Sequence, residues 1–217
     1  YAGMVGCQPG RARDTVAILS RMVEGGTLVM RSLTYGNWGL RALPCGDRLG
    51  VIRDAESRAM GRFGDYRDDA MSVQGLLEEI RIEGTCADIA SKDDGHLPII
   101  LSAQDERVNL QGMVQSLLPG CRVLKLRDPG WPGQLEAARA AGERPVLVGT
   151  VQSNGTGTNL QDRAGDFPRR LYLTGFSHQM TANVQALYRV LRFDSRSVPE
   201  VVIPFTRHPF EHHVLCN

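Results

Sequence analysis

Apolar runs and amphipathic segments alternate along the chain from residue 97 onward. Short apolar runs predict buried strands at 97–103, 121–127, 144–151, 168–176 and 198–206. Between them, apolar positions at helical spacing predict helices at 106–118, 132–142 and 179–192. Strands that alternate with helices indicate a parallel sheet with helices on both faces. The second half of the chain is therefore predicted to be an α/β domain.

The sequence before residue 67 is less regular. Two short strands are predicted at 27–35 and 38–44, and the "GNW" between them suits a hairpin turn. Helices are predicted at 11–24, 51–63 and 71–83. We expect residues 1–66 to form a smaller irregular α+β connecting segment and residues 67–217 to form the α/β domain.

Composition adds bounds on partners and compartment. The net charge of +1 in 217 residues gives no broad basic field for nucleic acid. Lys92 and Lys125 are the only lysines, so phosphate contacts would be made by arginine. The five cysteines are scattered without a C-x-x-C pair, which argues against a disulfide framework or zinc ribbon. No apolar run approaches membrane-spanning length, and we expect an intracellular protein, whether cytoplasmic, nuclear or virus-associated.

A glycine-rich turn follows the strand predicted at 144–151. In "SNGTGTNL" (153–160), Gly155 and Gly157 would let the backbone approach a ligand closely, and Thr156 could bond a phosphate or ribose oxygen. Taken alone, a G-x-G turn after a strand is more often a plain turn. The chain contains no G-x-x-x-x-G-K-[ST], so a complete phosphate-binding loop is absent from it.

A second candidate lies in "NVQALYRVLRFDSR" (183–196). Gln185, Arg189 and Arg192 recur at intervals of four and three, which would place them on one face of a helix. Two guanidinium groups and an amide could hold a γ-phosphate and the charge that develops during its transfer. A solvated helix face is the alternative explanation.

Together these two stretches resemble motifs V and VI of the second RecA-like lobe of superfamily-2 helicases. "QALYRVLR" is similar to Q-x-x-G-R-x-x-R, with Tyr188 in place of the glycine, and "LPIILSAQ" is similar to motif IV. "LVMRSLTYGNWGLRALP" resembles the hairpin of the strawberry-notch-like branch, and "VVIPFTRHPFEHHVL" the segment that follows motif VI in Snf2-like members. The fold implied for 67–217 is a RecA-like parallel sheet with helices on both faces.

The resemblance implies ATP hydrolysis coupled to movement on nucleic acid, either DNA or RNA. Arg189 and Arg192 would be arginine fingers, and Gln185 would position the γ-phosphate or the attacking water. The expected contacts with the nucleic-acid backbone are Gly155, Thr156, Gly157, Ser102 and Gln104. ATP and Mg²⁺ would be shared with a first RecA-like lobe absent from this chain, so we expect no activity from this chain alone.

If the resemblance holds, Arg189 and Arg192 should lie near the carboxyl edge of the sheet, without carboxylate partners from their own domain. A non-catalytic, helicase-derived module of a viral or replication assembly is the main alternative, since Tyr188 departs from the motif. A nucleotide-binding or glycosyltransferase-like lobe is a third, for which no complete pocket is evident in the sequence. His208 and His212 are weak metal candidates, and Asp93 and Asp94 are interpreted as part of a solvated loop.

Overall fold

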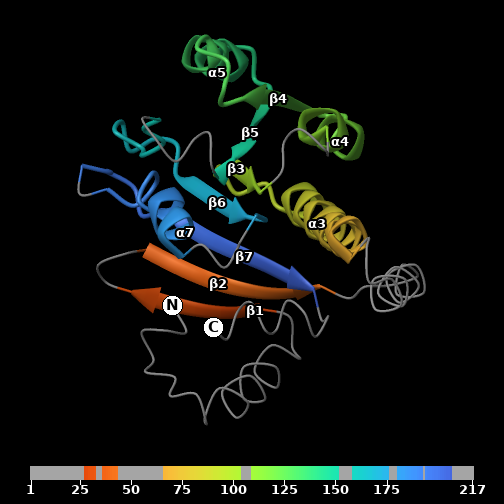
Figure 1. Ribbon diagram of the computed structural model, residues 1–217. Coiled ribbons are helices and arrows are strands. Elements are labelled where there is room, and N and C mark those ends of the chain that lie inside the picture. Colours follow the sequence, from red (N-terminus) through yellow and green to blue (C-terminus); the bar gives the residue numbers. More distant parts are fainter. Residues whose placement is uncertain are drawn as a thin grey trace.

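The structure is a computed structural model in which part of the chain is described (Figure 1). The described residues are 27–32, 36–43, 66–103, 109–151, 158–175, 180–192 and 194–206. The helices predicted at 11–24 and 51–63, the segment after residue 206 with His208 and His212, and the site candidates Gln104, Gly155, Thr156 and Gly157 lie outside these ranges.

A single sheet of seven strands runs through the described part. In chain order the strands are β1 (Thr27–Ser32), β2 (Gly36–Leu43), β3 (Leu97–Ser102), β4 (Cys121–Lys125), β5 (Arg144–Thr150), β6 (Arg169–Leu173) and β7 (Glu200–Thr206). Their order in the sheet is β1-β2-β7-β6-β3-β5-β4, and every neighbouring pair from β2 to β4 is parallel. Central β3 is hydrogen-bonded to β5 on one side and β6 on the other.

The predicted hairpin is present and extends this sheet, but the turn predicted at "GNW" (36–38) is wrong, because these three residues are the first of β2. β1 pairs antiparallel with β2, from Thr27 opposite Arg41 to Ser32 opposite Gly36. β2 then pairs in parallel with β7 along its length. The hairpin is thus hydrogen-bonded to the α/β sheet, and the domain boundary between residues 66 and 67 stays a prediction.

Four described helices cover the two faces of the sheet. They are α3 (Tyr66–Ser91), α4 (Leu110–Leu117), α5 (Trp131–Ala140) and α7 (Met180–Leu187). Alternate strand residues point to opposite faces, and they divide the core in two. Leu97, Ile99 and Leu101 belong to a cluster with residues of α5 and α7. Ile100 belongs to a second cluster with residues of α3 and α4.

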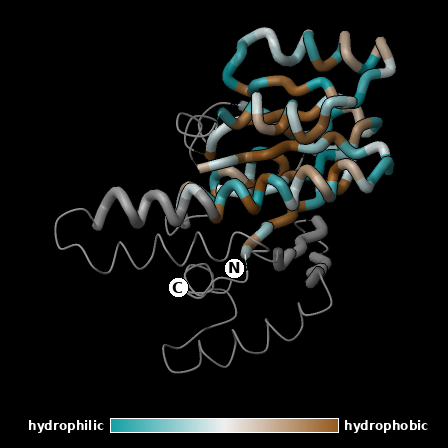
Figure 2. Tube along the Cα trace, turned by 90° about the vertical axis from the view of Figure 1, so that its right-hand side faces the viewer, coloured by the Kyte–Doolittle hydropathy of each residue, from teal (hydrophilic) through white to brown (hydrophobic). Residues whose placement is uncertain are grey.

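This two-sided burial explains why the strands are apolar at almost every position. Figure 2 shows hydrophobic positions concentrated in the central strands and hydrophilic ones on the outer turns of the helices. The predicted fold class is confirmed, an α/β domain with a parallel sheet and helices on both faces.

Helix α3 is longer than the sequence predicts. The prediction stopped at residue 83, before Gly84, whereas the helix continues to Ser91. Ile82, Cys86 and Ile89 recur at intervals of four and three, and all three are buried in the cluster beside α4. This tertiary burial outweighs the low helix propensity of Gly84 and Thr85.

Gly175, just after β6, packs directly on the end of β3. Its backbone N–H donates to the carbonyl of Leu101 at 2.9 Å. A Cβ on Gly175 would lie 2.1 Å from the backbone nitrogen of Ala103 and 2.4 Å from the carbonyl carbon of Ser102. Both obstacles are backbone atoms, so only a residue without a side chain fits here.

We predict that Gly175→Ala lowers the free energy of unfolding by about 1–3 kcal/mol or more, because the end of β3 must move to admit the methyl group. Urea unfolding of the chain measures this. Gly133→Ala in α5 is the matched control, since a Cβ there meets nothing within 4 Å. Equal stability of the two variants would contradict the close approach.

Candidate functional site

The segment that follows α7 carries the two candidate arginines. α7 ends at Leu187, whereas the sequence predicted a helix to residue 192. The N–H of Arg189 donates to the carbonyl of Ala186, three residues back, at 3.2 Å, which marks a tightening final turn. Arg192 lies beyond this turn, outside any helix. The predicted single helical face for Gln185, Arg189 and Arg192 is therefore wrong.

The end of α7 lies toward the amino ends of the strands. The carbonyl of Arg189 accepts a hydrogen bond from the N–H of Leu160 at 3.2 Å, and the carbonyl of Leu160 accepts one from Nε of Arg169 at 3.0 Å. Arg169 is the first residue of β6. A position at the carboxyl edge was expected for Arg189 and Arg192, and this is wrong. A helix that joins two parallel strands starts at the carboxyl end of the first and returns to the amino end of the second.

The described residues provide no carboxylate partner for Arg189 or Arg192. Arg189 is half-buried, and its Nε is buried without a hydrogen-bond partner. Arg192 is exposed. A buried guanidinium N–H without a partner costs free energy that an incoming anion could recover. The expectation that these two arginines have no carboxylate partner anywhere in their domain stays a prediction.

Some other arginines of the described part have carboxylate partners, as Arg139 and Arg170 do, and others, such as Arg127, have none. Arg139 lies 2.8 Å from Asp166. Asp194 is the only acidic residue between positions 188 and 199. Its carboxylate lies 3.3 Å from Nε of Arg163 and accepts a hydrogen bond from Gln161 at 3.2 Å. The segment after α7 therefore keeps an excess of positive charge.

The short insertion "QDRAGDFPRR" (161–170), which leads into β6, is built around buried Asp162. Its carboxylate accepts the N–H groups of Gly165 at 2.9 Å and Phe167 at 3.2 Å. Burial opposes the charge, but the hydrogen bonds, among them these two, hold the pKa of Asp162 below the ordinary value. The carbonyl of Asp162 also accepts the N–H of Arg196 at 2.8 Å. Two backbone hydrogen bonds, one at Leu160 and one at Asp162, thus join this part of the chain to the segment after α7, in addition to the side-chain contacts of Asp194.

Gln185 lies on α7 and is exposed. Its neighbours Ala186 and Leu187 are buried against the sheet, in the cluster shared with α5. The amide is therefore on the outer side of the helix, where a ligand can reach it. Its role toward phosphate or water stays a prediction.

Ser102, a candidate nucleic-acid contact, ends β3 at the carboxyl edge of the sheet. The residue is fully buried, and its hydroxyl donates to Oε1 of Glu78 on α3. The same oxygen accepts the N–H of Ala103 at 2.9 Å. Glu78 itself is buried, at 2% exposure. The role of Ser102 toward nucleic acid stays a prediction.

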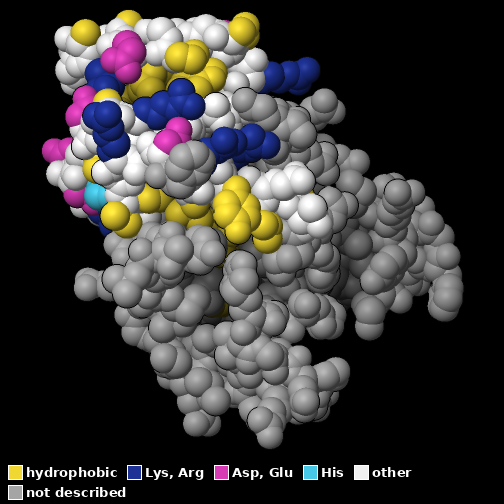
Figure 3. Space-filling model, turned by 90° about the vertical axis from the view of Figure 1, so that its left-hand side faces the viewer, with side chains coloured by type: hydrophobic (Ala, Val, Ile, Leu, Met, Phe, Trp, Pro, Cys, Tyr) yellow, Lys and Arg dark blue, Asp and Glu magenta, His cyan; other side chains and the backbone are white. Residues whose placement is uncertain are grey.

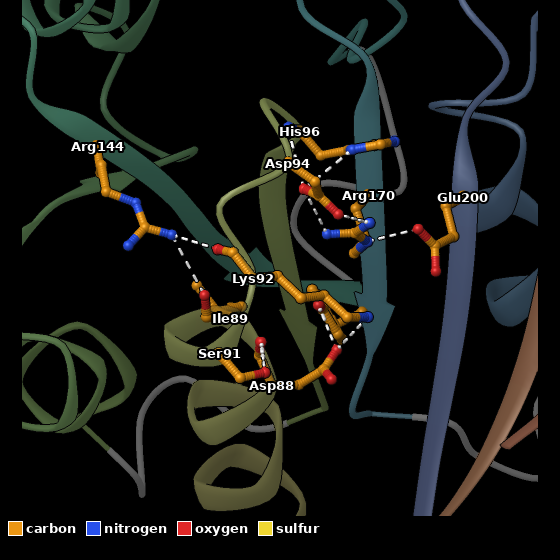
Figure 4. A network of polar contacts seen from close by, with 10 residues as sticks. Asp88, Ile89, Ser91, Lys92, Asp94, His96, Arg144, Arg170 and Glu200 are labelled. Carbon is orange, nitrogen blue, oxygen red and sulfur yellow. Dashed lines mark hydrogen bonds and ion pairs between the residues drawn. The ribbon is translucent and has the colours of Figure 1, made fainter. Parts of the chain in front are cut away.

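At the opposite edge, Arg170 joins the starts of three strands (Figure 4). Its guanidinium donates to the carboxylate of Asp94, just before β3, with one bond of 3.0 Å, and to that of Glu200, the first residue of β7. Asp94 was interpreted as part of a solvated loop, whereas it is half of this ion pair. The sequence hint to this network was an arginine, Arg170, and an acidic residue, Glu200, at the starts of two apolar strands.

A second polar contact lies beside this network, on the same side of the sheet as α3. The hydroxyl of Tyr172 donates to Oδ2 of Asp88 at 2.7 Å, and Nζ of Lys92 lies 2.9 Å from the same oxygen. Burial, followed by the hydrogen bond to Asp88, raises the pKa of Tyr172 well above its usual range. The tyrosine therefore stays protonated and acts as a structural donor.

ATP and Mg²⁺, the expected cofactors, need anion-binding groups and metal ligands. Arg189, with its unsatisfied Nε, and exposed Arg192 suit the phosphates of ATP. Within the described ranges, no group of three or more His, Cys, Asp or Glu side chains could hold a metal ion. In the same ranges, no helix is both long and apolar enough to cross a bilayer.

Comparisons with known proteins find similar chains among solved structures. No family model and no curated protein matches the chain. Among solved structures, the crystal structure of the C-terminal part of the Fun30 ATPase domain is similar, with 16% sequence identity and a TM-score of 0.49. The similarity covers 63% of this chain and 44% of that one, so this chain spans less than half of its length. It assigns neither an activity nor a ligand to this protein.

The Asp94–Arg170 pair predicts a pH dependence of stability. The hydrogen bond from Arg170 holds the pKa of folded Asp94 well below its ordinary value, whereas the unfolded chain returns it to about 3.9. The stabilisation is complete above that pH and is lost as the pH falls below it. We predict that Asp94→Asn lowers stability at neutral pH and flattens the loss of stability in acid.

Urea unfolding at a series of pH values measures this effect. Asp93→Asn is the control, because it changes the same charge on a side chain that is 91% exposed. If the free energy of unfolding falls equally steeply in acid for Asp94→Asn and for the unmodified chain, the pair does not stabilise the fold.

Proposed function

We propose that this chain is the C-terminal lobe of a nucleic-acid-dependent ATPase of the helicase or translocase type, similar to the strawberry-notch-like branch of superfamily 2. One observation carries the proposal. Arg189 and Arg192 lack carboxylate partners in the described part, and Arg189 is hydrogen-bonded to Leu160 at the end of the glycine-rich stretch. The two motifs of the resemblance are thus neighbours in space.

The arginines would act on a nucleotide held mainly by a first lobe. ATP with Mg²⁺ would supply the phosphoryl group, whose transfer develops charge on its oxygens. Arg192 would donate its N–H groups to those oxygens from the exposed side of the segment. Arg189, positioned by its backbone bond to Leu160, would donate from its guanidinium group. Gln185 would orient the terminal phosphate or the attacking water from the outer side of α7.

Nucleic acid would be contacted by the loop after β5. Gly155, Thr156 and Gly157 would present backbone N–H groups and a hydroxyl to phosphates, and Ser102 and Gln104 would add further contacts. The Leu160–Arg189 hydrogen bond supports coupling, because a shift of the glycine-rich stretch would be passed to the arginine segment through it.

A non-catalytic interaction module is the second candidate. Tyr188 favours it, because this side chain replaces the glycine of the motif and is 47% exposed. The upstream sequence of the gene separates the two candidates. A Walker A motif there supports the ATPase, and its absence supports the module.

We predict that Arg192→Ala, in the protein that contains both lobes, lowers nucleic-acid-stimulated ATP hydrolysis by about a thousandfold, as loss of an arginine finger does. A steady-state phosphate-release assay measures this, with the 217-residue chain as an inactive baseline. Arg127→Ala is the matched control, since Arg127 is exposed after β4 and has no ion pair in the described part. Normal hydrolysis by Arg192→Ala would remove the finger assignment.

We also predict that this chain alone binds single-stranded nucleic acid weakly, with an affinity that falls steeply as salt rises. The net charge of +1 offers no broad attraction, so a few phosphate contacts must supply the binding. Fluorescence anisotropy at two salt concentrations tests this. Tight binding that is insensitive to salt would indicate a different kind of surface.

A further inference from the structure

Tyr188 is an exposed aromatic side chain on an otherwise anchored turn. It exposes 47% of its surface, whereas Leu187 before it and Val190 after it are buried. The N–H of Tyr188 bonds to the carbonyl of Val184 at 3.0 Å, and the next residue is held by Leu160. The ring therefore stands on a fixed backbone and points away from the core.

The segment that carries this ring has more basic than acidic residues. Within the described part, the Tyr188 side chain has no hydrogen-bond or ring partner, and Arg189, Arg192 and Arg196 have no carboxylate partner. The one acidic residue of the segment, Asp194, is engaged by Arg163 and Gln161. Figure 3, which views the domain from the side of α5 and α7, shows basic and hydrophobic side chains next to one another.

A free aromatic face beside unpaired guanidinium groups suits a ligand that is both aromatic and anionic. Nucleobases stack on tyrosine rings, and arginines bind the attached phosphates. A protein partner could also use tyrosine and arginine, but the surplus of positive charge favours an anion. We propose that Tyr188 is a stacking platform for a nucleobase whose phosphates are bound by Arg189 and Arg192.

This inference rests on the proposed function, because it places phosphate at the same two arginines. It adds a role for the residue that departs from the motif. The base can come from a mononucleotide or from a single strand of nucleic acid. The two sources share their chemistry and are separated by the choice of probe.

The test is a set of calorimetric titrations of the 217-residue chain. The probes with bases are ATP and a single-stranded oligothymidylate. The probes without bases are tripolyphosphate and an abasic oligonucleotide of the same length. The variants are Tyr188→Leu, which keeps apolar bulk but removes the ring, and Tyr188→Phe, which keeps the ring. Leu117→Ala is the matched control, because Leu117 is an exposed apolar residue of α4.

We expect Tyr188→Leu to raise the Kd for ATP or for the oligothymidylate by about five- to a hundredfold. The Kd for the corresponding base-free probe should not change, and Tyr188→Phe and Leu117→Ala should bind as the unmodified chain does. An effect confined to ATP identifies a mononucleotide site, and one confined to the oligothymidylate identifies a strand site.

Three outcomes overturn the inference. They are unchanged binding of both base-containing probes by Tyr188→Leu, equal weakening of the base-free probes, and binding of none of the probes by the unmodified chain, which would favour a protein partner. Failure of the proposed function has a different signature. In that case Arg192→Ala would leave tripolyphosphate binding unchanged, whatever Tyr188→Leu does.

Discussion

The ion pairs of Arg170 fix the side of the sheet from which the candidate site is built. The guanidinium is buried, and it joins the loop before β3 to the first residue of β7. Its partners Asp94 and Glu200 are partly exposed, with side-chain exposures of 41% and 27%, and the bonds to them hold the starts of β3, β6 and β7 together. Arg170 also stands opposite Glu200 in the register of β6 and β7. The chain that leaves β6 must therefore return to a fixed point before β7 can begin.

That return path explains where the arginines lie. α7 covers the sheet with Ala186 and Leu187 and ends where the chain turns toward β7. The insertion before β6 meets it there, through the bonds at Leu160 and Asp162. The only acidic residue of the segment is held by Arg163. Positive charge is thus left unpaired on a backbone that is itself well bonded, which is the arrangement expected of an anion site and not of a mobile surface loop.

The fold could be predicted from the sequence because every strand of the α/β domain is buried on both faces. Such strands form continuous apolar runs, and all five were placed within a few residues of their observed bounds. The helix ends were less predictable. Gly84 suggested a stop in α3 that the burial of Cys86 and Ile89 overrides, and the pattern after Leu187 suggested a helix that the return to β7 ends.

The polar part of the site was only partly predictable for a related reason. Arg189 and Arg192 stand out by spacing, but pairing depends on residues far apart in the chain. Glu78 reaches Ser102, and Arg170 reaches Asp94, across more than twenty and seventy residues respectively. No local pattern carries such partners, so a buried carboxylate and a solvated one look alike in the sequence.

The orientation of Tyr188 determines whether the tyrosine in place of the motif glycine argues against an ATPase. A bulky residue at a glycine position would disable the site if its side chain filled the space beside Arg189. The structure places Leu187 and Val190 on the buried side of the turn and Tyr188 on the outer side. The ring therefore does not displace a core side chain, and Nε of Arg189 does not donate to the tyrosine hydroxyl. A tyrosine in this orientation adds a contact surface next to Arg189 and Arg192, the arginines proposed to bind phosphate, so the substitution is compatible with the proposed ATPase lobe.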